Sequence, residues 1–289
     1  MSLDTPILLT LLLAAVSPWL FAAGRRGFLL TGVLLHAGHL LYYIGQLAAV
    51  AGGETRTTHA RNSWFPTDLV AWSFSGNPWA LIFAVMISGI GLLIFIYAVG
   101  YFGAAAKARR FFAPLLAFEA TMLGLVLADD AVLLFLFWEL TSITSFFLIG
   151  FHHDDFKSRW NALQALLVTG LGGVAMLAGF LMLGHQWGTL SLTDWRAEVA
   201  AGAIPSVAPL VLILLGAMTK SALFPFFFWL PNAMSAPTPV SGFLHSATMV
   251  KAGIYLVGAL HPLLETSRLI LEILVISGGL TALAGLILG

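Results

Sequence analysis

The sequence predicts an all-α fold, a polytopic membrane helix bundle of about nine transmembrane helices, one of them discontinuous. Of the 289 residues, 60% are hydrophobic and only 9% are charged, whereas soluble domains carry about 25% charged residues. The apolar segments also repeatedly reach the roughly 20 residues that a helix needs to cross a bilayer. So little polar material cannot cover a water-facing surface, which excludes a soluble globular fold.

Apolar segments separated by polar breaks supply the expected spans. They cover residues 6–23, 28–51, 78–102, 111–128, 131–151, 161–184, 207–235, 240–262 and 268–289. We expect the first segment to be a retained helix, because Asp4 precedes it where a signal peptide carries basic residues. The last segment stops at Gly289 without a polar end, so we expect a fragment of a longer protein.

The seventh segment is expected to be the discontinuous one. Prolines recur between residues 223 and 240, at Pro225, Pro231, Pro237 and Pro239. Each proline lacks a backbone donor and disturbs the preceding helical turn. Irregular backbone is tolerated at membrane depth only where protein or a watery cavity surrounds it. We therefore expect this broken-helix segment to lie inside the bundle.

The basic residues between the segments predict the orientation in the membrane. The loops after spans one, three and five contain Arg25, Arg26, Lys107, Arg109, Arg110, Lys157 and Arg159. The loops after spans two, four, six and eight contain Arg56, Arg61, Arg196 and Arg268. Because cytoplasmic loops are enriched in Lys and Arg, we expect the first set inside a bacterial cell and the N-terminus outside.

Composition limits the partners and cofactors. Lys plus Arg and Asp plus Glu both number 13, so no charge excess favours nucleic acid, and the lipid bilayer is the expected surrounding. The absence of cysteine excludes disulfides and cysteine-ligated clusters. His36 and His39 could ligate metal or haem, but no matching pair accompanies them. We expect packing or a minor proton role for them, and no metal or cofactor.

Four ionisable residues lie close to the middle of apolar segments, namely Glu119, Glu139, Lys220 and Lys251. Such a residue costs about 2.5–3.5 kcal/mol at a helix centre when it is unpaired, so these charges need one another or water. They could be structural ion pairs that fix helix register. The alternative is proton transport, because the protonation of a desolvated lysine depends strongly on its distance from a carboxylate.

Polar residues accompany two of these charges. Ser241, His245, Thr248 and Lys251 step by four, three and three, which places them on an arc of about 120° in a continuous helix. Ser142 and Ser145 likewise follow Glu139 in steps of three. These faces could line a hydrogen-bonded proton path. For the hydroxyls, ordinary interhelical hydrogen bonding is the alternative, and for His245 it is a satisfied core histidine.

Small residues at Gly170, Gly172, Gly173, Ala175 and Gly179 suit close helix packing. Their G-x-G-x-x-A spacing is similar to a dinucleotide-binding loop, but no strand precedes it and it lies inside an apolar helix. We therefore expect packing and no nucleotide.

Two stretches carry a resemblance to a known family. They are FWELTSITSFFLIGF at 137–151 and FPFFFWLPNAMSAPTPVSGFLHSATMVKAGIYL at 224–256. Both resemble the antiporter-like membrane subunits shared by respiratory complex I and Mrp-type multisubunit Na+/H+ antiporters. The motif HSATMVKAG is most similar to the A-type subunit of the Mrp-type proteins. The resemblance covers the chain from about residue 88 onward.

The resemblance implies two inverted five-helix repeats, each with a discontinuous helix. It implies N-terminal helices at 1–110, a first repeat forming a proton half-channel at 111–262, and the start of a following helix at 263–289, with the second repeat missing. The family's functional residues match Glu139, Lys220, His245 and Lys251. In this scheme Glu139 switches Lys220 between its charged and neutral forms, and the proton moves on through Lys251.

The resemblance also implies the function and its rivals. It implies a membrane transporter subunit, not an enzyme, which moves protons and Na+ or another monovalent cation together with other membrane subunits. One rival is a proton-pumping subunit of complex I or a membrane-bound hydrogenase. Another is a non-conducting scaffold subunit, since Leu223 and Phe227 stand where relatives often have polar residues. Glu119 matches no family position clearly and stays a candidate from its depth alone.

Overall fold

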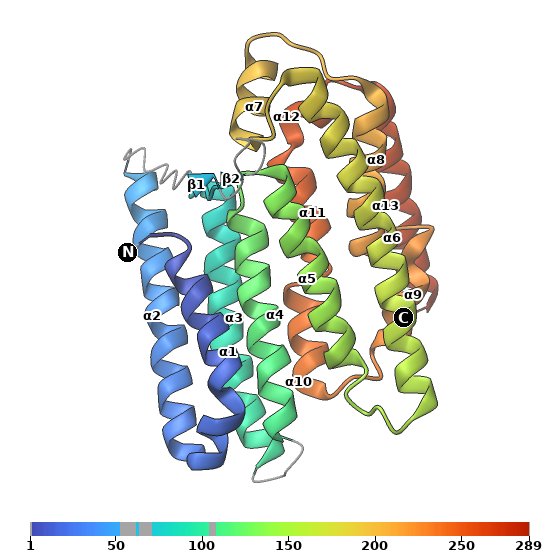
Figure 1. Ribbon diagram of the computed structural model, residues 1–289. Helices are drawn as coiled ribbons and strands as arrows, with labels where there is room; N and C mark the ends of the chain where they lie inside the picture. The colour runs from blue at the N-terminus through green and yellow to red at the C-terminus, as the bar shows by residue number, and fades with distance from the viewer. Residues whose placement is uncertain (1, 53–61, 64–70, 104–107, 289) are drawn as a thin grey trace.

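The computed structural model describes residues 2–52, 62–63, 71–103 and 108–288, and it confirms the all-α membrane bundle (Figure 1). In these residues, seven helices are long and apolar enough to cross a membrane. They are α1 (Thr5–Ala23), α2 (Arg25–Ala51), α3 (Pro78–Phe102), α4 (Ala108–Leu127), α5 (Ala131–Ile149), α6 (Phe156–Trp187) and α13 (Arg268–Leu288). One antiparallel strand pair, β1 (Asn62–Ser63) with β2 (Ala71–Trp72), is the exception to the helical fold.

Shorter helices fill the chain between α6 and α13. They are α7 (Leu192–Ala200), α8 (Val207–Lys220), η1 (Phe226–Phe228), α9 (Trp229–Ala233), α10 (Thr238–Val240), η2 (Ser241–Ala247), α11 (Lys251–Ala259) and α12 (His261–Leu264). The segment 207–235 is thus divided at its prolines. Pro225 directly precedes η1, Pro231 lies in α9, and Pro237 and Pro239 lie at the start of α10.

The segment 240–262 is also interrupted, so the expectation of a continuous helix there is wrong. Residues Ser241–Ala247 form a π-helix, which is wider than an α-helix, and α11 begins only at Lys251. The Thr248 hydroxyl donates to the carbonyl of Phe243 at 2.6 Å, and such side-chain bonds compete with regular helix geometry. The arc of about 120° assumed 100° per residue throughout, which this segment does not keep.

Polar residues at the helix starts explain several boundaries. The Asn77 side chain accepts a hydrogen bond from the backbone N–H of Ala80 at 2.9 Å, and Pro78 follows it at the first helical position. Asp130 accepts from two backbone N–H groups of α5, both at 2.9 Å. Asp155 does the same for α6. Asn, Asp and Ser are favoured N-caps because their oxygens satisfy donors that the helix leaves free.

The helices stand side by side, so basic first turns collect at one end. The first turns of α2, α4 and α6 lie at the lower end of the bundle in Figure 1. These turns contain Arg25, Arg26, Arg109, Arg110, Lys157 and Arg159. The described part of the chain thus keeps the charge asymmetry that the sequence indicates.

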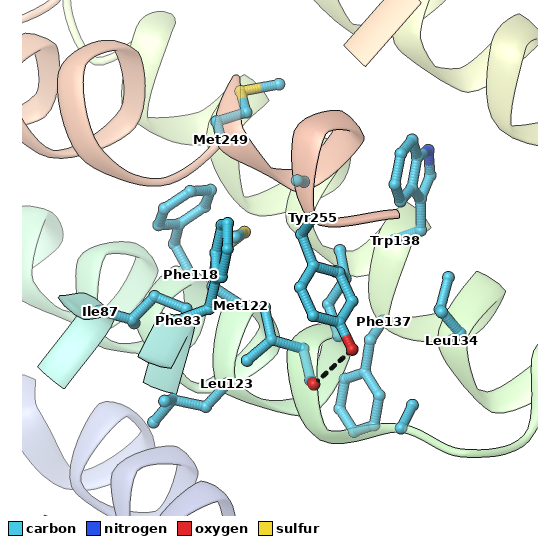
Figure 2. Close-up of a cluster of buried hydrophobic side chains, with 14 of the residues drawn as sticks. Phe83, Ile87, Phe118, Met122, Leu123, Leu134, Phe137, Trp138, Met249 and Tyr255 are labelled. Carbon is cyan, nitrogen blue, oxygen red and sulfur yellow. Dashed lines mark hydrogen bonds between the residues drawn. The ribbon is translucent and has the colours of Figure 1, made fainter. Parts of the chain in front are cut away.

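One cluster of the hydrophobic core lies where α3, α4, α5 and α11 meet. Figure 2 shows aromatic and aliphatic side chains from these elements, including Phe83, Phe118, Phe137 and Tyr255, converging on one region. The Tyr255 hydroxyl donates to the backbone carbonyl of Val126 at 2.7 Å, and its ring packs edge-on against Phe83 at 5.3 Å. A buried tyrosine needs such a partner for its hydroxyl. Tyr255 therefore fastens α11 onto the end of α4.

Candidate functional site

Lys220, the last residue of α8, lies inside the bundle with 0% of its surface exposed. Its ammonium donates hydrogen bonds to the backbone carbonyl of Trp138 at 3.0 Å and to Ser142 Oγ at 2.7 Å. It also lies 5.2 Å from the centre of the Trp138 ring, within range of a cation–π interaction. One face of α5 thus holds the buried lysine.

A third helix joins this contact. The Thr169 hydroxyl of α6 lies 3.3 Å from Ser142 Oγ and donates to its own helix backbone at Ala165 at 2.8 Å. The indole N–H of Trp229 donates to the carbonyl of Thr219 at 3.0 Å, directly before Lys220. Helix α8 can end at this depth because an indole from the following segment satisfies one of its free carbonyls.

Glu139 is the neighbour of Trp138, and its carboxylate packs against α6. A Cβ added at Gly173 would overlap Glu139 Oε1, and one added at Gly170 would lie 3.6 Å from Oε2. Glu139 Oε1 is buried without a hydrogen-bond partner among the described residues. In this conformation Lys220 binds the α5 backbone and Ser142 instead of pairing with Glu139. Direct proton exchange between the two residues therefore needs a side-chain rearrangement or an intervening water.

Glycines on α6 let α5 and α8 approach closely enough to build this site. A Cβ at Gly172 would overlap the Thr219 side chain, and a Cβ at Gly179 would lie 2.6 Å from the carbonyl oxygen of Pro209. Both neighbours belong to the stretch of α8 that ends at Lys220. The small residues of α6 thus make close helix contacts, as expected from the sequence.

The interrupted segment 240–262 brings His245 near the Lys220 site. His245 lies on η2, is 6% exposed, and its ring centre is 6.4 Å from that of Trp229. The backbone of Ala233 approaches the ring, but neither ring nitrogen makes a hydrogen bond of normal geometry to a described residue. A buried polar side chain without a partner is unfavourable, so His245 stays a candidate for the proton path.

Lys251 begins α11 and is partly exposed. The residue after Lys220 and the residue before Lys251 are in contact, because the Ser221 hydroxyl donates to the carbonyl of Val250 at 2.6 Å. The backbones that carry the two lysines therefore meet, although the lysines are 31 positions apart in the sequence (251 minus 220). Only the tertiary structure brings these two backbone segments together.

The remaining hydroxyl candidates have local roles. Ser145 donates to the backbone of its own helix at Ser142, and Thr248 does so at Phe243. Ser241 is partly exposed at the start of η2. Leu223 and Phe227 are partly buried against the hydrophobic core. Of the predicted hydroxyls, Ser142 is therefore the one that hydrogen-bonds Lys220.

Glu119 lies apart from these residues and has a partner that could not be predicted from its segment alone. Its Oε2 is 2.7 Å from Nε2 of His36 on α2, and both side chains are buried. The sequence indicates only packing, a minor proton role or metal ligation for His36. In the described residues, no group of three or more ligand-type side chains could hold a metal ion. The signal that could have found the pair is a buried acid and a histidine that both lie near the middle of their segments.

A polar cluster closes the opposite end of α5 from the basic first turns. Asp129 accepts hydrogen bonds from the hydroxyls of Thr193 at 2.5 Å and Ser191 at 3.1 Å, and Arg196 lies 3.6 Å away. Burial raises the pKa of the neighbouring Asp130 carboxyl above its ordinary value of 3.8, although backbone N–H groups partly oppose this. These bonds hold α7 against the start of α5, which carries the site.

Comparisons with known proteins identify relatives along most of the chain. At 44% identity over 232 residues, it is similar to a probable K(+)/H(+) antiporter A/B subunit of Rhizobium meliloti, covering 78% of this chain and 23% of the relative. At 37% identity over 270 residues, it is similar to the Na(+)/H(+) antiporter A1 subunit of Staphylococcus haemolyticus, covering 92% and 33%. The chain thus spans about a quarter to a third of the length of these curated relatives.

Two solved structures contain chains that are similar to this one. The Mrp complex from Dietzia sp. DQ12-45-1b contains a chain that matches with a TM-score of 0.74 and 36% identity, covering 89% of this chain and 28% of that one. An archaeal membrane-bound sulfane sulfur reductase shares the fold at 22% identity, with a TM-score of 0.71, 88% of this chain and 51% of that one covered.

Family models match two parts of the chain. The model described as complex I chain 5 N-terminus matches residues 64–112. The model described as NADH:quinone oxidoreductase/Mrp antiporter, TM, matches residues 128–289, which is more than half of the chain and includes Glu139, Lys220, His245 and Lys251. The chain belongs to the NADH:quinone oxidoreductase/Mrp antiporter transmembrane family.

Proposed function

We propose that this chain is part of the A-type subunit of a multisubunit cation/proton antiporter and carries a proton half-channel. The observation that supports this best is the buried lysine at the end of α8. Lys220 has 0% exposure, and three neutral groups, a carbonyl, a hydroxyl and an aromatic ring, hold its ammonium. A charge kept at membrane depth is expensive, and a change in its hydration or in Glu139, with which it interacts electrostatically, can release its proton.

Glu139 is the proposed switch in this route. Its Oε1 has no hydrogen-bond partner among the described residues, so the carboxylate can turn toward Lys220 without losing a bond. When the carboxylate turns, it stabilises the charged lysine, and when it turns back, the lysine can donate its proton. His245 and Lys251 are the proposed next carriers, because His245 has free ring nitrogens and the backbones at Lys251 and Lys220 are in contact.

The proposed organisation assigns residues 1–110 to N-terminal helices, 111–262 to the first repeat with the half-channel, and 263–289 to the start of the next helix. The chain is a multi-pass membrane protein. We propose the bacterial inner membrane as its location, with the N-terminus outside, which the basic first turns of α2, α4 and α6 favour. The proposed partners are other membrane subunits, and the proposed cargo is protons and Na+ or another monovalent cation such as K+.

A redox-driven proton pump is the second candidate. It is favoured by the match of residues 64–112 to the complex I chain 5 N-terminus. Both candidates use the same buried lysine. They differ in how proton movement is coupled. In the first it is exchanged for cation movement, and in the second electron transfer in partner subunits drives it.

The test replaces Lys220 by alanine in the full-length chain within its complex. We expect cation resistance of the cells and cation-driven proton flux in everted vesicles to be lost while the complex still assembles. Lys157→Ala is the control, because Lys157 is exposed at the start of α6, and it should leave both unchanged. Unchanged flux in Lys220→Ala would leave Lys220 a structural role and contradict the proposal.

A further inference from the structure

A second buried charge pair lies between α2 and α4, outside the Lys220 site. His36 Nε2 and Glu119 Oε2 are 2.7 Å apart, and the residues are 0% and 1% exposed. The His36 ring also stacks on Phe95 of α3, with ring centres 5.0 Å apart. On the carboxylate side, α3 presents Gly91, where an added Cβ would come within 2.6 Å of Glu119 Oε1. Three helices therefore enclose the pair.

The hydrogen-bond geometry shows how many protons the pair holds. His36 Nδ1 lies 2.6 Å from the carbonyl oxygen of Gly32, and a carbonyl can only accept, so Nδ1 carries a hydrogen. The contact between Nε2 and Glu119 Oε2 then requires one further proton between the two atoms, on either the ring or the carboxyl. Without that proton, a ring lone pair would face a buried carboxylate, which is strongly unfavourable.

The surroundings of the pair contain free proton acceptors. Glu119 Oε1, Ser88 Oγ and His39 Nε2 are all buried without a hydrogen-bond partner among the described residues. His39 lies three residues from His36 on α2, and its Nδ1 is 3.4 Å from Thr10 Oγ1. Since the Thr10 hydroxyl already donates to Pro6, it accepts from Nδ1, which leaves Nε2 of His39 with a lone pair.

Few titratable groups surround the pair. His39 and Tyr43 lie on α2, the helix of His36. His39 interacts electrostatically with His36, and Tyr43 does so with Glu119. The neighbouring helices α1 and α3 contribute the hydroxyls of Thr10 and Ser88. No lysine or arginine of the described residues forms an ion pair with Glu119. The charge of Glu119 is therefore balanced by the proton that it shares with His36.

We propose that His36 and Glu119 form a second proton-binding site, which holds one exchangeable proton in a shared hydrogen bond and passes it along α2 to His39. A purely structural pair would be a weak choice, because hydrophobic residues of similar size often stabilise as well as a buried ion pair does. The acceptors beside the pair have no hydrogen-bond partner among the described residues, and proton exchange needs such free acceptors. The N-terminal helices thus take part in proton binding as well as in packing.

Infrared difference spectroscopy of the purified complex that contains the full-length chain tests this site directly. Spectra recorded at two pH values, in H2O and in D2O, report the carboxyl and imidazole groups that bind a proton. We expect Glu119→Gln to remove a carboxyl band and His36→Gln to shift that same band, because both residues share one proton. No ion gradient is used, so the result is independent of the proposed antiport.

The chain offers a matched control pair. His261 Nδ1 and Glu265 Oε2 are 3.4 Å apart but the side chains are 63% and 52% exposed, so Glu265→Gln should leave the band in place. Should Glu119→Gln fail to assemble, His36→Gln carries the test, since its side-chain amide can still donate to Glu119 Oε2. A carboxyl band that is unchanged in Glu119→Gln, or unshifted in His36→Gln, would overturn the proposal.

Discussion

Adding one methyl group at Gly173 should disturb the candidate site although no ionisable residue is replaced. The Cβ of an alanine there would overlap Glu139 Oε1 and lie 3.2 Å from both the carboxyl carbon of Glu139 and Cδ1 of Trp138. The same change at Gly170 places its Cβ 3.6 Å from Glu139 Oε2, an ordinary contact. Gly170→Ala is therefore a matched control on the same helix and beside the same carboxylate.

The two substitutions should differ in free energy by a predictable amount. Each replaces a glycine inside α6, which stabilises a helix by about 1 kcal/mol. Only Gly173→Ala adds an overpacking cost, and it lies at the low end of the usual range, about 1 kcal/mol, because Glu139 Oε1 ends a flexible side chain that can move and Trp138 Cδ1 is then the tight neighbour. Gly170→Ala should thus raise the free energy of unfolding by about 1 kcal/mol, and Gly173→Ala should leave it within about 1 kcal/mol of the unmodified protein.

Transport should separate the variants more clearly than stability. In Gly173→Ala the Glu139 carboxylate has to leave its position against α6, so the proposed switch starts from a different geometry. An overpacking energy of about 1 kcal/mol expressed in the transport step lowers the rate about 5-fold. The assay is cation-driven proton flux in everted vesicles, with complex assembly measured in parallel. Equal flux in the assembled Gly170→Ala and Gly173→Ala complexes would refute this reasoning.

Two further predictions concern single hydrogen-bonding groups. Ser142→Ala removes an acceptor that lies 2.7 Å from the ammonium of Lys220; a bond to a charged group contributes about 1.5–3 kcal/mol, so proton flux should fall about 10- to 150-fold. Ser145→Ala breaks only a bond to its own helix, and an equal loss of flux there would contradict the assignment. Asp130→Asn keeps the cap of α5 but does not titrate. Because burial raises the pKa of Asp130 above 3.8, its stabilising contribution is present below that ordinary value and is lost as the pH rises through the raised pKa. The Tm of Asp130→Asn relative to the unmodified protein should therefore be higher at neutral pH than near pH 3.8, and a pH-independent difference in Tm would contradict this.

Much of the fold follows from local properties of the sequence. Runs of apolar residues predict membrane helices because each residue contributes its own transfer free energy to the bilayer. The break after Lys220 agrees with four closely spaced prolines, each of which removes a backbone donor and disturbs the preceding helical turn. The interruption near Thr248 could not be predicted in the same way. It depends on a hydroxyl bond to the Phe243 carbonyl and on a π-helix, and neither leaves a signal in hydropathy.

The residues of the site could be predicted, but their partners could not. A position close to the middle of an apolar segment was enough to identify Glu119, Glu139, Lys220 and Lys251 as candidates. A charge in such a segment is costly wherever the helix lies. Hydropathy could not indicate that the ammonium of Lys220 binds Ser142 and the α5 backbone.

The sequence by itself thus determined that this protein is a membrane helix bundle with ionisable groups in its interior, because both properties are sums over neighbouring residues. Only the tertiary structure decided that Lys220 meets Ser142, that Glu139 faces Gly173, and that His36 holds Glu119 from 83 positions away. The physical reason is that a side chain's partner depends on how each helix is rotated and packed against its neighbours. That rotation is set by contacts between distant segments, such as the close approach of α6 to α5 and α8 at its glycines.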